Sequence, residues 1–486
     1  MRTNTKPVIK SAVKTQLTFL ATSLALMMSS SAFADSAMSS AANPSSAQTD
    51  NQALLKRIEE LERKLLLLSS NQNGGQSEKQ SADQSSVAAQ VPNTSLAESQ
   101  ADSAVAAQTA TNERAQPAVA RGSTGIFGSG ASRFNPEIGV ILNGRFASYS
   151  QDESEPSGYA IGHEGERGKE GFSVDHTELR LSSNIDSNFY GNVTVALAEH
   201  EGEIEVELEE AYLETLPDLG LPSGLSLKAG RALWQLGYLN AQHSHTDDFA
   251  DRPLPYRLML DGAYNDDGVQ ASYLLPTSQY IEVGGGAFAG NDFPFSEADT
   301  SSPAWLAFVR TGADLSASTS FTAGASYLSG EANGRESNDD ELSFTGDSDL
   351  AVIDAKLTFS PSQNLRYQQL TLQGEYFHQV EDGEFASETD AADLNRKTDG
   401  WYAQSIYRFH PEYRVGLRYA DMNPDGALLG AEADDYSSWS VMGDWSPSEF
   451  SRLRLQLNRE DVGQETDNQV VLQYIMSLGA HSAHNY

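Results

Sequence analysis

The sequence predicts an all-β fold, a 16-stranded antiparallel transmembrane β-barrel, preceded by a short α-helical coiled coil. Three observations predict it. From about residue 134 onward, short segments alternate apolar and polar side chains, long and short connections alternate between them, and a heptad pattern occupies residues 50–69. An alternation of period two gives a strand one apolar face for lipid and one polar face for a water-filled interior.

Composition limits the classes of function. The chain has 486 residues, a formal net charge of −36, a mean hydropathy of −0.44 and no cysteine. Such acidity argues against a nucleic-acid partner, because phosphates would be repelled, and favours cations as what the surface attracts. The lack of cysteine excludes disulfides, thiolate metal sites and cysteine nucleophiles.

The first residues have the pattern of a secretory signal. Four basic residues precede the apolar run "LTFLATSLALMM", and Ala32-Phe33-Ala34 forms a small-x-small cleavage site. The run is too short to be a transmembrane helix. Residues 1–34 are therefore predicted to be a signal peptide that exports the chain.

Two further segments precede the barrel. Residues 50–69 space five apolar side chains by four, three, four and three residues, which is the a/d seam of a coiled coil. These are Leu54, Ile58, Leu61, Leu65 and Leu68. The alternative is a single surface helix. Residues 70–133 are rich in Ser, Gln and Ala without periodicity, so we expect a disordered periplasmic linker.

Residues 134–486 make the predicted barrel. Its strands are expected at 136–149, 172–184, 189–199, 203–216, 224–234, 268–275, 279–290, 303–313, 319–329, 350–360, 364–379, 400–409, 413–421, 437–446, 450–459 and 468–486. A soluble β-sandwich is the alternative. The signal peptide and the unequal connections favour the barrel.

The connections and aromatic residues supply the membrane orientation. The longer connections are expected at 150–171, 235–267, 291–302, 330–349, 380–399 and 422–436. Long external loops and short periplasmic turns are typical of outer-membrane barrels. Interfacial aromatic girdles are expected from Tyr149, Tyr190, Trp305, Tyr327, Trp401, Tyr402 and Trp445. The chain ends on Tyr486, in phase with an apolar strand face.

The stretch "EGEIEVELEEAYLE" is a candidate for the pore lining. Glu203, Glu205, Glu207 and Glu209 alternate with Ile204, Val206 and Leu208. A lumen filled with water keeps such carboxylates ionised, and rows of acidic residues favour cations entering a pore. The pattern breaks at Glu210, where we expect a bulge or the strand's rim. The alternative is a solubilising acidic wall without selectivity.

Two basic residues accompany the acidic row. Arg180 and Lys228 occupy the polar phase of their predicted strands. Opposed basic and acidic walls would make a transverse field at a constriction. Alternatively, Arg180 forms a simple cross-strand pair with a glutamate.

The connection 235–267 carries the candidate metal ligands in "HSHTDDFADRPLPYR". These are His243, His245, Asp247, Asp248 and Asp251. Imidazole and carboxylate groups at this spacing can supply three or four ligands to Zn²⁺ or a similar divalent cation. The alternative is a polar loop with two titrating histidines. A second pair, His481 and His484, lacks carboxylates and is interpreted as a feature of the tail.

The architecture resembles trimeric Gram-negative outer-membrane porins with an N-terminal coiled coil, including the phosphate-selective porin O/P type. "GFSVDHTELRLSSNID", "VELEEAYLETL", "LKAGRALWQLGYLNAQHSHTDDFADRPLPYR" and "NDDGVQASYL" resemble a narrower group, often labelled zinc-regulated or TonB-dependent outer-membrane proteins. The resemblance implies a homotrimer in the outer membrane, with a coiled coil in the periplasm. In 16-stranded porins the third external loop folds inward and narrows the pore.

The sequence therefore predicts a porin that passes small hydrophilic solutes, prefers cations and is linked to zinc or another divalent metal. It predicts no enzyme, since no nucleophile motif occurs, and no required cofactor beyond a weakly bound Zn²⁺ or similar ion. Its expected partners are lipid, itself and small ions. Two alternatives remain, a TonB-dependent receptor for a metal or metallophore and an envelope tether anchored by the barrel.

Overall fold

The computed structural model describes most of the region predicted to form the barrel. The described residues are 136–151, 156–200, 203–295, 303–338, 341–362, 364 and 367–479. The predicted signal peptide, coiled coil, linker and C-terminal histidine pair lie outside them. Among the described residues, no helix is long and apolar enough to cross a membrane.

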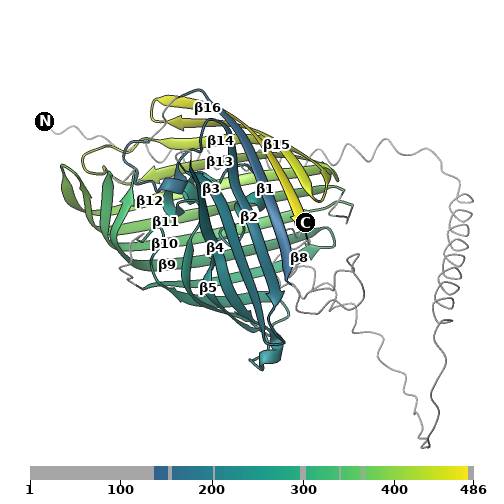
Figure 1. The fold of residues 1–486 in the computed structure, drawn as a ribbon. Coiled ribbons are helices and arrows are strands. Elements are labelled where there is room, and N and C mark those ends of the chain that lie inside the picture. Colours follow the sequence, from purple (N-terminus) through teal and green to yellow (C-terminus); the bar gives the residue numbers. More distant parts are fainter. Residues whose placement is uncertain are drawn as a thin grey trace, which may run out of the picture. The chain divides into compact units, whose positions relative to one another are not determined.

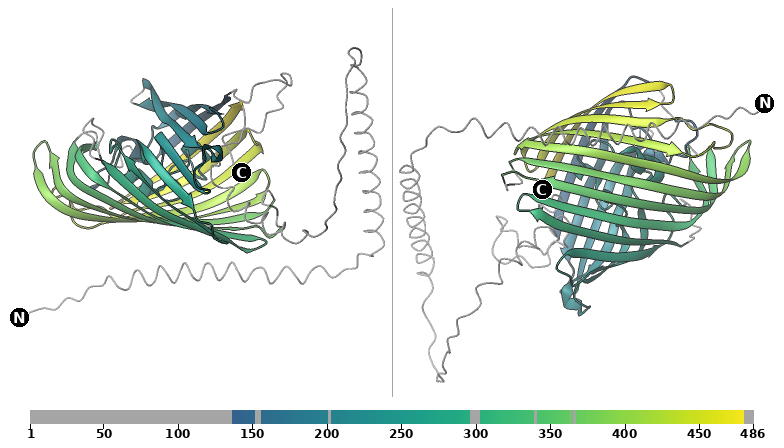
Figure 2. Two further views of the ribbon diagram at one scale, coloured as in Figure 1. Left: turned by 90° about the horizontal axis from the view of Figure 1, so that it is seen from below. Right: turned by 180° about the vertical axis from the view of Figure 1, so that it is seen from behind.

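Sixteen strands close into one antiparallel barrel, as predicted, because β1 pairs with β16 (Figures 1 and 2). The strands are β1 (Glu137–Tyr149), β2 (Gly171–Asn184), β3 (Phe189–His200), β4 (Glu203–Thr215), β5 (Leu225–Leu233), β6 (Asn265–Leu274), β7 (Tyr280–Phe288), β8 (Ala304–Ser316), β9 (Thr319–Ser337), β10 (Leu342–Phe359), β11 (Gln369–Ser387), β12 (Ala391–His410), β13 (Tyr413–Pro424), β14 (Tyr436–Ser448), β15 (Ser451–Val462) and β16 (Glu465–Gly479).

The two ends of the barrel differ in their connections. We name the end that carries residues 150–170 (L1), 234–264 (L3) and 289–303 (L4) the loop end, and the opposite end the turn end. β1 begins and β16 ends at the turn end. Its connections include the tight hairpins 317–318 and 411–412. The described helices are η2 (His163–Gly165), η3 (Pro217–Leu219), η4 (Ser244–Thr246) and α4 (Leu254–Leu260).

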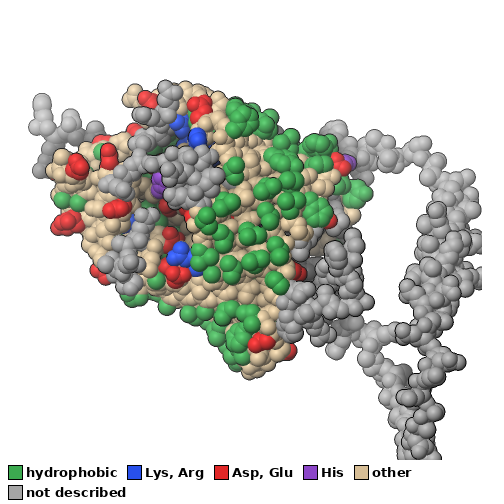
Figure 3. Space-filling model, in the orientation of Figure 1, with side chains coloured by type: hydrophobic (Ala, Val, Ile, Leu, Met, Phe, Trp, Pro, Cys, Tyr) green, Lys and Arg blue, Asp and Glu red, His purple; other side chains and the backbone are tan. Residues whose placement is uncertain are grey.

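The outer face of the barrel is apolar. Val309, Ile353 and Leu417 are 43%, 60% and 46% exposed, while the residues that alternate with such side chains point inward and are mostly polar. Figure 3 shows hydrophobic side chains spread over the strands nearest the viewer. Because one face of every strand is offered to an apolar solvent, the alternation has the form expected of a barrel that spans a bilayer.

The predicted girdle is partly wrong. Trp305, Tyr327 and Trp445 do lie on the outer face. Tyr190 and Tyr402 are instead buried inside the barrel, 3% and 1% exposed, because their phase in the strand is the inward one. The hydroxyl of Tyr149 donates a hydrogen bond to the Gly168 carbonyl oxygen in L1. The outer aromatic band toward the turn end consists of Tyr407, Phe409, Tyr413, Trp445 and Phe450.

Two of the predicted loops are strands. β9 to β12 run through most of 330–349 and 380–399, so only short turns connect them at the loop end. On their extensions the outer face is acidic, as at Glu331, while Ala332, Phe344 and Phe385 are buried inside together with the Arg335–Glu381 ion pair. In Figure 3 acidic side chains gather toward the left of the view. The prediction required apolar side chains on the outer face, so it ended these strands where the outer face becomes polar.

L3 folds into the barrel and forms its core. Residues of L3 pack with residues on the inner faces of β5 and of β7 to β15 into one large cluster of buried apolar side chains. Its largest L3 members are Trp234, Leu236, Tyr256, Leu258 and Tyr264. The connection predicted to fold inward therefore does so. It fills one side of the lumen and leaves the side next to β1, β2, β4 and β16 open.

Candidate functional site

Glutamates of β4 border the open side of the lumen. Val206 and Leu208 on β4 are 71% and 47% exposed on the outer face, so Glu207 and Glu209 point inward. Thr194 pairs with Glu210 whereas Val195 pairs with Leu208, so Glu209 is the extra residue of a bulge. The bulge predicted near 210 is confirmed, and it brings both Glu209 and Glu210 to the lumen. Glu203 and Glu205 lie on the same strand, and only their backbone is described.

A cavity of about 890 Å³ lies between this acidic wall, L1 and L3. Seven carboxylates border it, against five arginines. The carboxylates are Glu164, Glu166, Glu207, Glu209, Asp251, Asp261 and Asp292, and the arginines are Arg145, Arg167, Arg231, Arg252 and Arg257. The cavity therefore has the size for small hydrophilic solutes and an excess of acidic groups.

A protonation equilibrium is built into the cavity. Glu164 in L1 keeps part of its surface exposed, yet burial inside the barrel, followed by the neighbouring Asp261 carboxylate, raises the pKa of its carboxyl to about 8. Burial and the Glu164 and Asp261 carboxyls raise the pKa of Asp292 in L4. The backbone amide of Asn265 donates a hydrogen bond to Asp292, which lowers this pKa, but by less. These groups therefore carry less negative charge near neutral pH than their number suggests.

The three aspartates predicted as metal ligands are each held by an arginine. Asp247 lies 2.8 Å from Arg252, Asp248 lies 2.7 Å from Arg414, and Asp251 accepts from Arg418. Two of those arginines belong to β13, on the wall that L3 faces. The predicted five-residue set is therefore split, because these carboxylates fasten L3 to the basic wall instead of turning toward the histidines.

That basic wall is a continuous row across six strands. Cross-strand pairing joins Arg408 of β12 to Arg414, Arg414 to Asp444, and Asp444 to Arg454 of β15. The row continues through Gln473 to Arg145 of β1. The Arg414 guanidinium donates to both oxygens of Asp444, and Asp444 has no exposed side-chain surface. Arginine is thus the main side chain of the wall opposite the acidic row.

The two histidines lie on the acidic wall. His245 Nδ1 is 2.6 Å from Glu178 Oε1 of β2, and His243 Nδ1 is 3.4 Å from Glu178 Oε2. His243 also lies 3.1 Å from both Glu209 and Glu210. Burial alone would lower the pKa of His243, but the Glu209, Glu178 and Glu210 carboxylates outweigh it and raise that pKa well above 6.5.

Arg180 and Lys228 do not form the wall opposite the glutamates. Arg180 Nε donates to Asn192 Oδ1 at 2.7 Å, and its register partner on β3 is Thr194, whose own partner is Glu210. The Lys228 ammonium lies 4.4 Å from the centre of the Tyr212 ring. Both cations therefore sit on the acidic wall itself, where they offset part of its charge.

One buried carboxylate fixes the entry of L3. Glu375 of β11 accepts hydrogen bonds from the backbone amides of Tyr238 and Leu239 and from the hydroxyls of Tyr256 and Tyr402. Gly237 has a φ of +63°, and a Cβ there would collide with the same carboxylate. Glycine is required at this position because L3 approaches Glu375 so closely.

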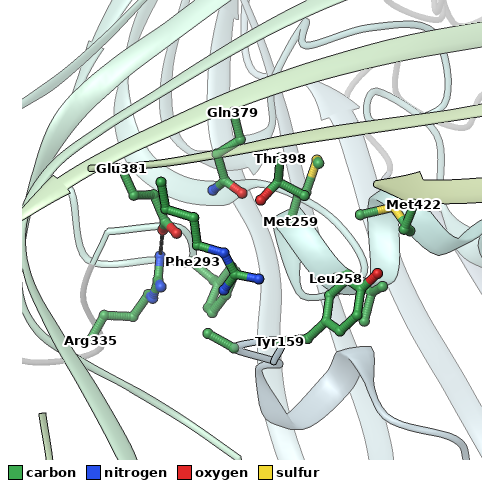
Figure 4. Close-up of a pocket in the computed structure, with 11 residues that line it drawn as sticks. Tyr159, Leu258, Met259, Phe293, Arg335, Gln379, Glu381, Thr398 and Met422 are labelled. Carbon is green, nitrogen blue, oxygen red and sulfur yellow. Dashed lines mark hydrogen bonds and ion pairs between the residues drawn. The ribbon is translucent and has the colours of Figure 1, made fainter. Parts of the chain in front are cut away.

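A second hollow is a packing junction. It holds about 20 Å³ where L1, L3 and L4 meet β9, β11 and β12 (Figure 4). Arg335 pairs with Glu381 beside Phe293, and Arg396 donates to the Gly158 carbonyl oxygen. This volume fits one water molecule, not a solute. The junction therefore stabilises the loops over the lumen.

Sequence reasoning missed Glu178, Glu210 and most of the basic wall. Glu178 and the arginines of β13 and β15 all lie in the inward phase of predicted strands. Their position in the inward phase could therefore have identified them as lumen-facing residues. Which wall residues His243 and His245 meet depends on how L3 folds, and residue spacing alone does not give that.

Known proteins show similarity to this chain in sequence or in structure. No family model matches the sequence. A protein of Aquifex aeolicus (strain VF5), described as uncharacterized, is 29% identical over 387 residues, which cover 73% of this chain and 80% of that protein. The outer membrane channel DcaP of Acinetobacter baumannii is 14% identical, with a TM-score of 0.49, over 72% of this chain and 99% of its own. An anion-selective porin from Comamonas acidovorans is 11% identical, with a TM-score of 0.46, over 71% and 99%.

Proposed function

We propose that the chain forms a water-filled diffusion channel in the Gram-negative outer membrane for small hydrophilic solutes. One observation carries the proposal. A closed barrel with an apolar outer face encloses a polar cavity of about 890 Å³ beside an inward-folded L3. A buried polar space of this size is costly unless water fills it, and water inside a membrane barrel is what a diffusion channel requires.

The charge distribution supports a preference for cations. The arginines of β13 are engaged by Asp248, Asp251 and Asp444, whereas Glu207 and Glu209 of β4 border the cavity. Carboxylate rings and rows favour cations at a pore. The two walls also create a field across the lumen, with glutamates on β4 and arginines on β12 to β15.

The proposal includes assembly and permeant ions. Three barrels are expected to associate as a homotrimer, with the heptads of 50–69 gathering the linkers in the periplasm. Zn²⁺ or another divalent metal is expected among the permeant cations, with no cofactor required. The side chains expected to set selectivity are Glu203, Glu205, Glu207, Glu209, Arg180 and Lys228.

The test is charge removal from the acidic row. Replacing the four glutamates at 203, 205, 207 and 209 by glutamine removes negative charge from the lumen without changing side-chain size. The ratio of cation to anion permeability, measured from reversal potentials in planar bilayers, should fall. The matched control removes four exposed acidic charges from the hairpins at the loop end, with Glu331, Glu336 and Glu384 changed to Gln and Asp347 to Asn.

The control should leave the permeability ratio nearly unchanged, because those side chains point away from the lumen and salt screens them. An equal ratio in wild type and the lumenal variant would make the row a solubilising wall. A protein that inserts but never conducts would favour the receptor or the tether instead.

A further inference from the structure

Three side chains of the acidic wall converge as metal ligands do. The ligand atoms of Glu178, His243 and His245 all lie within 4.8 Å of one another. Glu178 comes from β2, and both histidines come from the segment of L3 around η4. The side chains of Glu178 and His245 are each 2% exposed and that of His243 is 15% exposed. A small shift of these side chains would bring three ligands to one ion.

A further carboxylate is already placed to orient a ligand. His243 presents Nδ1 toward Glu178, and its Nε2 lies 3.1 Å from Glu210 Oε2. Glu210 is itself fixed by the Asn192 amide, 2.9 Å away. Metal-binding histidines commonly donate the second ring N–H to a carboxylate, which fixes ring orientation and tautomer.

The donor set points to a class of metal. Two imidazoles and one carboxylate form the set that binds Zn²⁺ with a fourth position left open, whereas Ca²⁺ and Mg²⁺ prefer sites built from oxygen ligands. Glu209 Oε1 lies 3.1 Å from His243 Nδ1, and Glu209 Oε2 is buried without a hydrogen-bond partner among the described residues. The three surrounding glutamates also favour a divalent cation electrostatically.

We propose that Glu178, His243 and His245 form a binding site for a divalent transition metal ion of the Zn²⁺ class. The ion would join L3 to the β2–β4 wall beside the cavity. This deepens the proposed channel function, and its placement in the permeation path rests on that function. Because L3 lies inside the barrel, an ion held there reduces the current of monovalent cations while it remains bound.

Metal binding is measured on the full chain in detergent, after chelator treatment and dialysis. Titration with Zn²⁺ should give one site per chain. The variants Glu178→Gln and His245→Ala each remove one of three ligands, so the dissociation constant should rise by at least 10-fold. Glu210→Gln disturbs the orientation of His243 and removes one nearby negative charge, and it should cost roughly 10–100-fold. His481→Ala combined with His484→Ala is the matched control and should bind Zn²⁺ like wild type.

A second measurement guards against variants that misfold. Co²⁺ added to the wild-type protein should give visible absorption bands of imidazole and carboxylate coordination, and Zn²⁺ but not Ca²⁺ should abolish them. Equal Zn²⁺ affinity in wild type and in both ligand variants overturns the site, as does the absence of Co²⁺ bands in folded wild type. Conductance in the presence of chelator is scored separately, so the site can fail while the channel stands.

Discussion

At the scale of single residues, ion pairs between side chains organise the lumen. Arg414 illustrates this, since its guanidinium contacts Asp444 on the next strand and Asp248 in L3. The arginine is 12% exposed and Asp444 has no exposed side-chain surface. One side chain therefore joins the barrel wall to the loop that narrows it.

Loss of that guanidinium should destabilise the barrel. Arg414→Gln leaves Asp444 buried beside more distant arginines, of which Arg454 is 3.9 Å away. Removing one partner of a buried ion pair costs about 3–5 kcal/mol. We expect a decrease of this size in the free energy of unfolding, measured by denaturant titration in detergent micelles.

Arg459→Gln is the matched control for this prediction. Arg459 pairs with Asp461 on the exposed surface, where the two side chains are 59% and 39% exposed. Solvent-exposed pairs contribute little, so its unfolding curve should coincide with that of wild type. Equal curves for all three proteins would mean that Arg414 does not fasten L3 to the wall.

At the scale of elements, period-two alternation located every strand, yet it misjudged four of them. β9 to β12 continue past the predicted ends at 329, 350, 379 and 400. There the outer face turns acidic, and Phe344 and Phe385 pack together inside. Because the prediction looked for apolar side chains on the outer face, it assigned these polar-faced extensions to loops.

The candidate site was predicted in part for a similar reason. The inward fold of L3 followed from the resemblance to 16-stranded porins, and the inward phase of Glu207 and Glu209 followed from the alternation in the sequence. The partners of His243 and His245 did not, because Glu178 is 65 residues before His243 in the numbering and meets it only through the folding of L3. Sequence proximity suggested Asp247, Asp248 and Asp251 instead, and the arginines of β13 and of L3 itself hold those carboxylates.

L1 should make the selectivity depend on pH. The folded protein raises the pKa of Glu164 to about 8, above its usual 4.5. The carboxyl therefore ionises as the pH rises through about 8, which adds negative charge to the cavity. Cation preference should increase from about pH 7 to about pH 9. Because the raised pKa belongs to the folded state, the protonated carboxyl stabilises that state fully below about pH 4.5, and this contribution is lost as the pH rises to about 8.

Reversal potentials recorded across this pH range measure the effect. Glu164→Gln should flatten the increase, while Glu331→Gln, on the outer surface, should retain it. A wild-type preference that falls with rising pH would contradict the assignment of Glu164 to the permeation path.

At the scale of the whole molecule, the chain combines an acidic barrel with an N-terminal segment of different character. The chain has a net charge of −36, and its charged side chains lie where the chain contacts water. The apolar belt belongs to the part in contact with lipid. The heptads of 50–69 remain a prediction about assembly, since they lie outside the described residues.

Deleting residues 50–69 should weaken the trimer. The heptads supply one apolar seam per chain, and three seams bury one another only when three chains associate. Native gels of the deletion variant should show more monomer than wild type at equal protein concentration. The control is a variant that lacks an equal length of the 70–133 linker and keeps residues 50–69. Unaltered trimers in the deletion variant would mean that the barrels associate unaided.

The most direct test of the account is the current through wild-type protein reconstituted in planar bilayers under a KCl gradient. The account predicts stepwise openings whose reversal potential shows K⁺ to be more permeant than Cl⁻, because the carboxylates of β4, L1 and L4 border the path. Openings with Cl⁻ more permeant would mean that the arginine row sets the selectivity. Protein that inserts as folded trimers and carries no current would contradict the channel itself.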